Sequence, residues 1–252
     1  MTLKVDLNAD MGESFGPWKM GNDAALLDVV TSANIACGFH AGDPDVMAQT
    51  MGLAIEKDVG IGAHPGFADL QGFGRRRLAM SPRSLSHMIT YQMGAAQAMA
   101  EAAGGTLRHF KLHGALANWA SEDAEVARCC YQAALAYAPD INIFVLAATE
   151  METVVRALGC SWSGEIFADR AYNEDATLVD RSLPNAVISD PELAAQRVLE
   201  MVRSKAIISS TGKSIPARID TICLHGDGES ALKIARSVRQ SLTADGIKVT
   251  KV

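Results

Sequence analysis

The stretch Val5-Asp-Leu-Asn-Ala-Asp10 alternates apolar and polar side chains with a period of two, which is typical of a β-strand. This alternation sends Asp6, Asn8 and Asp10 to one side of the predicted sheet, and in a closed barrel that side is the lumen or its rim. Buried carboxylates are costly unless they are paired, so packing alone does not account for three polar residues on one face. The alternative is a solvent-facing edge strand, whose apolar side would have to cover the core alone.

Beyond this stretch, short apolar runs alternate with amphipathic segments of helical length, and we predict strands at residues 3–9, 33–37, 60–63, 109–112, 143–147, 163–167 and 221–224. Helix starts are indicated where a capping side chain precedes a proline, at Asp43-Pro44, Ser81-Pro82 and Asp190-Pro191. The run from Thr149 to Glu152 has the pattern of a capping box. Three glycines fall where helices should end: Gly104, Gly159 and Gly246.

Strands that alternate with helices imply a parallel sheet with right-handed crossovers, either closed into a barrel or open and doubly wound. Polar residues follow nearly every predicted strand, whereas an open sheet concentrates its site at one switch point. We therefore expect an α/β fold, a TIM-like (β/α) barrel with seven strands. No linker, low-complexity tract or internal repeat divides the chain, so we expect a single domain over residues 1–252.

Composition narrows the class of protein. The 252 residues carry a formal net charge of −6, which argues against nucleic-acid binding. The longest apolar stretches, such as residues 143–148, are far short of the roughly 18 to 20 residues that cross a bilayer. The first ten residues place charges where a secretory signal needs an apolar segment, so we expect a cytoplasmic protein. Cys37 and Cys223 lie in apolar runs, where we expect thiols to act as small buried hydrophobes.

Two motifs are misleading. Gly12-Glu-Ser-Phe-Gly16 matches the nucleophile elbow of serine hydrolases, but Pro17 and Trp18 follow it where a helix should begin. The stretch Gly212-Lys-Ser214 resembles the end of a phosphate-binding loop, but its leading glycine is replaced by Ile207 and no helix follows. The sequence therefore shows no nucleotide site of its own.

The histidines indicate a functional site more strongly than these two motifs do. A lone histidine is more often structural than functional, but four of the six in the chain follow predicted strands: His40, His64, His113 and His225. Lys111 alternates with His113, so both should face the same way, with Glu165, Asp169 and Asp227 available as counter-charges. We expect at least two of the histidines to lie in a site. The run Arg75-Arg-Arg77 suits a solvated face as well as an anion contact.

These residues lie in blocks that resemble the LamB/YcsF family, whose members act as the A subunit of the prokaryotic 5-oxoprolinase. The resemblance runs from residue 6 to residue 246 and rests on seven blocks, at residues 6–18, 33–43, 62–67, 70–76, 111–116, 165–172 and 222–227. Two positions depart from the family pattern: Leu112 stands where proline is usual and Ala117 where tyrosine is common. Both departures lie beside Lys111 and His113, and so bear on the geometry of that strand end.

The resemblance implies a hydrolase that acts on a cyclic amide, opening the lactam of 5-oxo-L-proline to L-glutamate with consumption of ATP. It implies two partners, subunits B and C, and a barrel like that of glycoside hydrolases and polysaccharide deacetylases. Because the chain has no phosphate-binding loop, we expect the partner subunits to bind and use ATP.

For this reaction we assign roles to residues at the strand ends. An amide needs an activated carbonyl, a positioned water and a proton for the leaving nitrogen. Asp10 or Glu13 is the expected base and His64 or His113 the expected proton donor, while Lys111 and Arg170 would bind an anionic phosphorylated intermediate. The expected catalytic residues are Asp10, Glu13, His64, Lys111 and His113. The expected substrate-binding residues are Asn8, His40, Arg75, Glu165, Arg170, His225 and Asp227.

Two alternatives stay open. The first is a metal-dependent hydrolase of the amidase or deacetylase type, because Asp10, His40 and His64 offer ligands that Zn²⁺ or Mn²⁺ accepts. The second is a non-catalytic module that delivers the substrate to subunits B and C. The sequence also leaves open which residue is the base and whether the chain forms a homo-oligomer.

Overall fold

The structure, a computed structural model, describes residues 3–225 and 230–252. Within these residues, seven parallel strands close into a barrel in the order β1-β2-β3-β4-β5-β6-β9, and β9 pairs with β1 to complete the ring. These strands are β1 (Lys4–Met11), β2 (Ser32–Ala36), β3 (Gly60–His64), β4 (Leu107–Phe110), β5 (Asn142–Leu146), β6 (Trp162–Phe167) and β9 (Thr221–Leu224). The predicted seven-stranded barrel is confirmed, with every strand at its expected place in the sequence.

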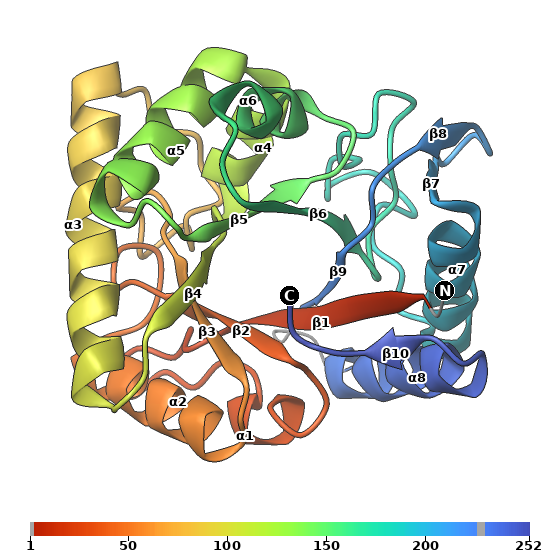
Figure 1. Cartoon of the computed structure of the whole chain (residues 1–252), viewed down its shortest axis with the longest axis horizontal. Coiled ribbons are helices and arrows are strands. Elements are labelled where there is room, and N and C mark those ends of the chain that lie inside the picture. The colour runs from red at the N-terminus through yellow and green to blue at the C-terminus, as the bar shows by residue number, and fades with distance from the viewer. Residues whose placement is uncertain (1–2, 226–229) are drawn as a thin grey trace.

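Helices surround the barrel (Figure 1). They are α1 (Asp23–Leu26), α2 (Pro44–Glu56), α3 (Pro82–Ala102), α4 (Gly114–Glu122), α5 (Ala124–Tyr137), α6 (Glu150–Leu158), α7 (Pro191–Ser204) and α8 (Ala231–Ala244). The main apolar core lies between the outer face of the barrel and this layer, and its members run from Val5 to Ile247. Among the described residues, no helix combines the length and the apolar composition that a membrane crossing requires.

The predicted helix caps are largely confirmed. The carboxylates of Asp43 and Asp190 and the hydroxyl of Ser81 accept hydrogen bonds from the first turns of α2, α7 and α3, respectively. The predicted capping box at the start of α6 was wrong in detail. The Thr149 hydroxyl donates to the Leu146 carbonyl, and the Glu152 carboxylate accepts from the Ala148 amide, one residue before the expected donor.

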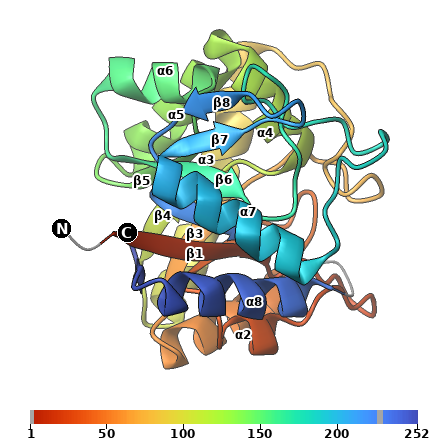
Figure 2. The same cartoon turned by 90° about the vertical axis from the view of Figure 1, so that its right-hand side faces the viewer.

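Three short strands were not predicted. β7 (Ala206–Ile208) and β8 (Ser214–Pro216) form an antiparallel hairpin between α7 and β9, and β10 (Lys248–Val249) adds to the start of β1. The stretch that resembles a phosphate-binding loop lies in the turn of this hairpin, so a strand follows it. In the side view the C-terminus lies at the left, and the long segment between β6 and α7 reaches the opposite end (Figure 2). That opposite end carries the carboxyl ends of the barrel strands.

Candidate active site

Polar side chains fill the barrel lumen along β1 and β4. Asp6, Asn8 and Asp10 of β1 all point inward and are buried, as their alternation predicts. The Lys111 ammonium lies at the centre of this group, 3.0 Å from Asp10 Oδ1 and 2.9 Å from Glu165 Oε1. A barrel of this type ordinarily fills its interior with branched apolar residues, so a lumen built around an ammonium and two carboxylates marks a chemical site.

The charges of this group are mutually dependent. Burial by itself would lower the pKa of Lys111, but the attraction of Asp10 and Glu165 raises that pKa well above its ordinary value. Burial would likewise raise the pKa of Asp10, yet His64 and Lys111 together hold it well below its usual range. Burial raises the pKa of Glu165, and Lys111 only partly offsets this effect. Asp10 is therefore the carboxylate of the pair that stays ionised most readily.

Asn34, on β2, fixes the orientation of Asp10 and was missed by the sequence analysis. Its amide Nδ2 donates to Asp10 Oδ1 at 2.8 Å and to Asn8 Oδ1 at 2.7 Å. Its Oδ1 lies 2.8 Å from His109 Nε2, which must carry the proton because an amide oxygen can only accept. Burial, with the nearby Lys111, lowers the pKa of His109 to about 3, so the ring is neutral. The alternation of β2 places Asn34 inward, and this was the available signal.

The His109 ring occupies space that only a glycine on the neighbouring strand leaves open. A Cβ at Gly62 would overlap His109 Nε2, and the ring cannot retreat because it stacks on Phe144 at a centroid distance of 4.2 Å. We expect Gly62→Ala to destabilise the fold by about 1–3 kcal/mol through overpacking. Gly52→Ala, in α2 with open space around the new methyl group, should instead stabilise it by about 0.5–1 kcal/mol. Urea unfolding of both variants checks the pair, and equal midpoints would contradict the packing argument.

Three histidines and a carboxylate cluster beside Asp10. His64 Nε2 lies 3.0 Å from His113 Nδ1 and 3.4 Å from Asp10 Oδ2. The rings of His40 and His113 stack with centroids 3.6 Å apart, and Glu13 Oε1 is 3.6 Å from His40 Nε2 and 3.7 Å from His113 Nδ1. Burial holds the pKa values of His40 and His113 well below their ordinary value, and the neighbouring histidine rings act in the same direction.

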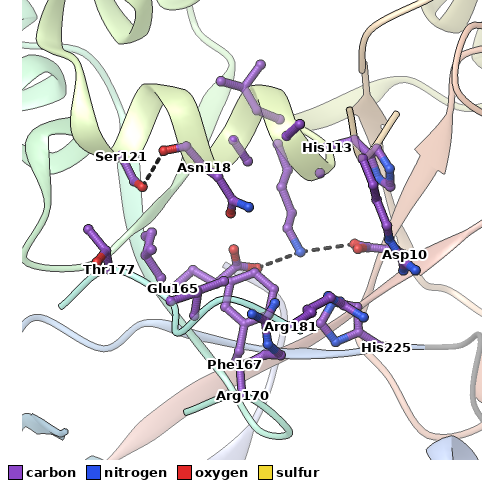
Figure 3. A pocket seen from close by; sticks show the side chains of 18 of the residues that line it. Asp10, His113, Asn118, Ser121, Glu165, Phe167, Arg170, Thr177, Arg181 and His225 are labelled. Carbon is purple, nitrogen blue, oxygen red and sulfur yellow. Dashed lines mark hydrogen bonds and ion pairs between the residues drawn. The ribbon is translucent and has the colours of Figure 1, made fainter. Parts of the chain in front are cut away.

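A cationic wall of the pocket lies on the other side of Asp10 from His113, and Figure 3 shows Arg170, Arg181 and His225 gathered there. His225 Nδ1 lies 2.8 Å from Asp169, so it carries the proton and leaves Nε2 to accept from Arg181 at 3.1 Å. Burial and the nearby Arg181 lower the pKa of Arg170 to about 10, so its guanidinium remains charged at neutral pH. The pocket that these arginines and the cluster line has a volume of about 610 Å³.

The chain is similar to known proteins over nearly its whole length. The model of the LamB/YcsF family matches residues 5–252. The chain belongs to the LamB/YcsF family. It is 65% identical to the A subunit of 5-oxoprolinase from Ruegeria pomeroyi over 247 residues, covering 98% of both chains. Its fold matches the crystal structure of a lactam utilization protein from Thermus thermophilus with a TM-score of 0.93 and 42% identity, covering 99% of this chain and 100% of that one.

The expected likeness to deacetylases holds at the level of the fold. The catalytic domain of a peptidoglycan N-acetylglucosamine deacetylase from Eubacterium rectale matches with a TM-score of 0.54 at 12% identity, covering all of this chain and 89% of that one. An identity this low concerns the architecture alone.

The structure of this LamB/YcsF protein brings most of the predicted site residues together. The predicted residues that line the pocket are Asp10, Glu13, His64, Arg75, Lys111, His113, Glu165, Arg170 and His225. Asn8 lies beneath them, bonded to Glu165 at 2.9 Å, and His40 lies behind His113. Leu112 and Ala117, the two departures from the family pattern, also line the pocket. Asp227 falls outside the described residues.

Other predictions are refined or corrected. Of the arginine run, Arg75 lines the pocket, whereas Arg76 pairs with Asp69 and Arg77 covers the Trp119 ring. Cys223 is fully buried, as predicted, and burial raises the pKa of its thiol, but it also has a polar contact that was not predicted. It follows Thr221 in the inward-facing alternation of β9, which places its Sγ 2.9 Å from the Lys111 ammonium. Arg181, in the long segment after β6, was also missed, because nothing in its local sequence ties it to a strand end.

Proposed function

We propose that this chain is the A subunit of an ATP-dependent 5-oxoprolinase, and that it opens the lactam of 5-oxo-L-proline to L-glutamate together with subunits B and C. The observation that carries this proposal is the 65% identity, over nearly the full length of both chains, to a protein named as the A subunit of 5-oxoprolinase. In this proposal the partner subunits bind ATP and transfer its terminal phosphoryl group to the lactam oxygen, in the cytoplasm where ATP is available.

The pocket offers a binding mode for the substrate. A five-membered lactam with one carboxylate is small enough for a cavity of about 610 Å³. The carboxylate suits the cationic wall, because the side chains of Arg170 and Arg181 both line the pocket. Arg181 is held in place by His225 and adds a second guanidinium at the rim. In this proposal the lactam ring lies over Asp10 and Lys111.

Asp10 is the group best placed to activate water. Its Oδ1 is fixed by Lys111 and Asn34, while Oδ2 faces His64 at the pocket wall. The Lys111 ammonium has four neighbours for its three hydrogens, so it acts by fixing Asp10 and Glu165 rather than by binding the carbonyl oxygen directly.

The proton for the leaving nitrogen has a simple source in this arrangement. His64 Nδ1 and His113 Nε2 are bonded to backbone carbonyls, and the remaining nitrogens of the two rings face each other. This orientation favours Asp10, after it takes a proton from water, as the group that passes the proton to the lactam nitrogen.

The carboxylate contact predicts a selective effect on substrate binding. Arg181→Ala removes a charge-assisted hydrogen bond worth about 1.5–3 kcal/mol, so KM for 5-oxoproline should rise roughly 10- to 150-fold with a smaller change in kcat. Arg77→Ala is the matched control, because Arg77 covers Trp119 and contributes nothing to the pocket lining. The measurement is KM and kcat for 5-oxoproline of the two variants in the assembled enzyme. An unchanged KM for Arg181→Ala would remove this residue from the substrate site.

A genetic experiment tests the proposed function in the cell. Deletion of the gene for the A subunit in Ruegeria pomeroyi should prevent growth on 5-oxoproline as sole nitrogen source, and expression of this chain should restore it. The Asp10→Asn variant, produced at the same level, should not. Restored growth with that variant, or no restoration with the native chain, counts against the proposal.

A further inference from the structure

We infer that the cluster of His40, His64, His113 and Glu13 is a binding site for one divalent transition-metal ion, zinc by ligand chemistry. This inference deepens the proposed function and rests on it only in placing the ion beside the reacting bond. One donor atom from each of the four residues lies within 4.8 Å of all the others. All four residues are buried.

The proton positions of two histidines are fixed by backbone carbonyls. His64 Nδ1 lies 2.9 Å from the Lys111 carbonyl, and His113 Nε2 lies 2.8 Å from the Phe73 carbonyl. A carbonyl oxygen only accepts, so both of these nitrogens carry hydrogen, and in neutral rings the other two nitrogens carry lone pairs. Those two nitrogens, His64 Nε2 and His113 Nδ1, are 3.0 Å apart. Two lone pairs at this distance repel, and a cation between them removes the conflict.

A single shared proton would satisfy that pair but not His40. The His40 side chain is fully buried, and neither of its ring nitrogens has a hydrogen-bond partner among the described residues. An unsatisfied buried polar group costs about 1–3 kcal/mol. His40 Nε2 is directed at the same place, 3.6 Å from Glu13 Oε1. A metal ion bound by all three imidazoles accounts for His40 Nε2 as well as for the facing pair.

The distances between donors agree with a metal of this size. Zinc–nitrogen bonds of about 2.0–2.1 Å place the ligands of a tetrahedral site about 3.3 Å from one another. The observed separations are 3.0 Å for His64 and His113, 3.6 Å for His40 and Glu13, and 3.7 Å for His113 and Glu13. The parallel rings of His40 and His113 must tilt toward each other for both to bind one ion.

The ligand chemistry and the surroundings select the kind of ion. Three imidazoles and one carboxylate suit zinc and its neighbours in the first transition row, whereas magnesium and calcium prefer oxygen ligands. Metal-binding histidines usually donate their second nitrogen to a carbonyl or carboxylate, as His64 and His113 do here. The set differs from the one expected from the sequence. Asp10 is not among the proposed ligands, because its Oδ1 is already held by Lys111 and Asn34. Glu13 and His113 join His40 and His64 instead.

Metal titration tests the inference without substrate, ATP or partner subunits. The full chain is stripped with a chelator and titrated with Zn²⁺ by calorimetry, and with Co²⁺ while its visible absorption is recorded. We expect one equivalent of each ion, with the strong visible bands of four-coordinate cobalt. Loss of a group that only orients a metal ligand weakens metal binding by at most roughly 100-fold. Glu13→Gln and His113→Gln remove ligands themselves, so each should weaken zinc binding by more than this.

His87→Gln is the matched control, because His87 is an exposed histidine on α3 and lies outside the cluster. It should bind one equivalent as tightly as the native chain. Circular dichroism establishes that each variant is folded. A native chain that binds no zinc, or ligand variants that bind zinc as tightly as the native chain, would overturn the inference. Either result leaves glutamate release to be judged separately, so the metal site and the proposed function can fail independently.

Discussion

Replacing Asp10 with Asn is expected to lower glutamate release from the assembled enzyme by roughly 10²- to 10⁴-fold, the range that a positioned general base contributes. The amide keeps the size of the carboxylate but cannot take a proton from water. Asn34 and Lys111 can still donate to its oxygen, so the geometry around position 10 should persist. The measurement is kcat with saturating 5-oxoproline and ATP.

Asp6→Asn is the matched control on the same face of the same strand. Asp6 is also fully buried, but its partners are the hydroxyls of Thr31, Ser32 and Thr221, and it does not line the pocket. Its kcat should stay close to that of the native chain. If Asp10→Asn retains near-normal turnover while folded, Asp10 has no part in the chemistry, and a role of this chain in substrate delivery becomes the better account.

The second large effect concerns Lys111 and appears in stability as well as activity. Lys111→Met leaves Asp10 and Glu165 buried without their shared cation. Breaking a buried ion pair in this way costs about 3–5 kcal/mol, which for a chain of this size lowers Tm by roughly 6–20 °C. Turnover should also be lost, because Asp10 is no longer held in place. Differential scanning calorimetry and the glutamate assay measure the two effects.

Lys57→Met provides the comparison for an exposed pair. Lys57 bonds to Asp28 at the surface, and such pairs contribute at most about 1 kcal/mol. If Lys111→Met lowers Tm by no more than Lys57→Met does, the central ammonium is not what stabilises the lumen. The assignment of Lys111 as the organising charge would then be wrong.

The barrel could be predicted from the sequence because its signals are local. Period-two alternation in β1 placed Asp6, Asn8 and Asp10 in the lumen, and proline-marked caps fixed the starts of α2, α3 and α7. The hairpin of β7 and β8 was missed because strands of three residues leave too short a pattern. The predicted capping box at Thr149 was wrong because the Thr149 hydroxyl donates to the end of β5, and Glu152 accepts from the amide one residue earlier than expected.

The site was predictable to the extent that its residues sit at strand ends. His64 and Lys111 could be found this way, because polar groups after apolar strands have few structural explanations. Asn34 and Cys223 lie within their strands. The alternation of β2 indicated an inward position for Asn34, but both residues reach the site because the closed barrel brings their strands beside β1. Arg181 reaches the pocket through a long segment whose path depends on tertiary contacts.

The central claim is that this chain, with its partners, opens 5-oxoproline. It is tested most directly by measuring glutamate formed from 5-oxoproline and ATP by this chain alone, by subunits B and C together, and by all three. We predict glutamate only from the complete mixture, in proportion to the amount of this chain when it is limiting. Glutamate formed by B and C alone at the same rate as by the complete mixture would contradict the account.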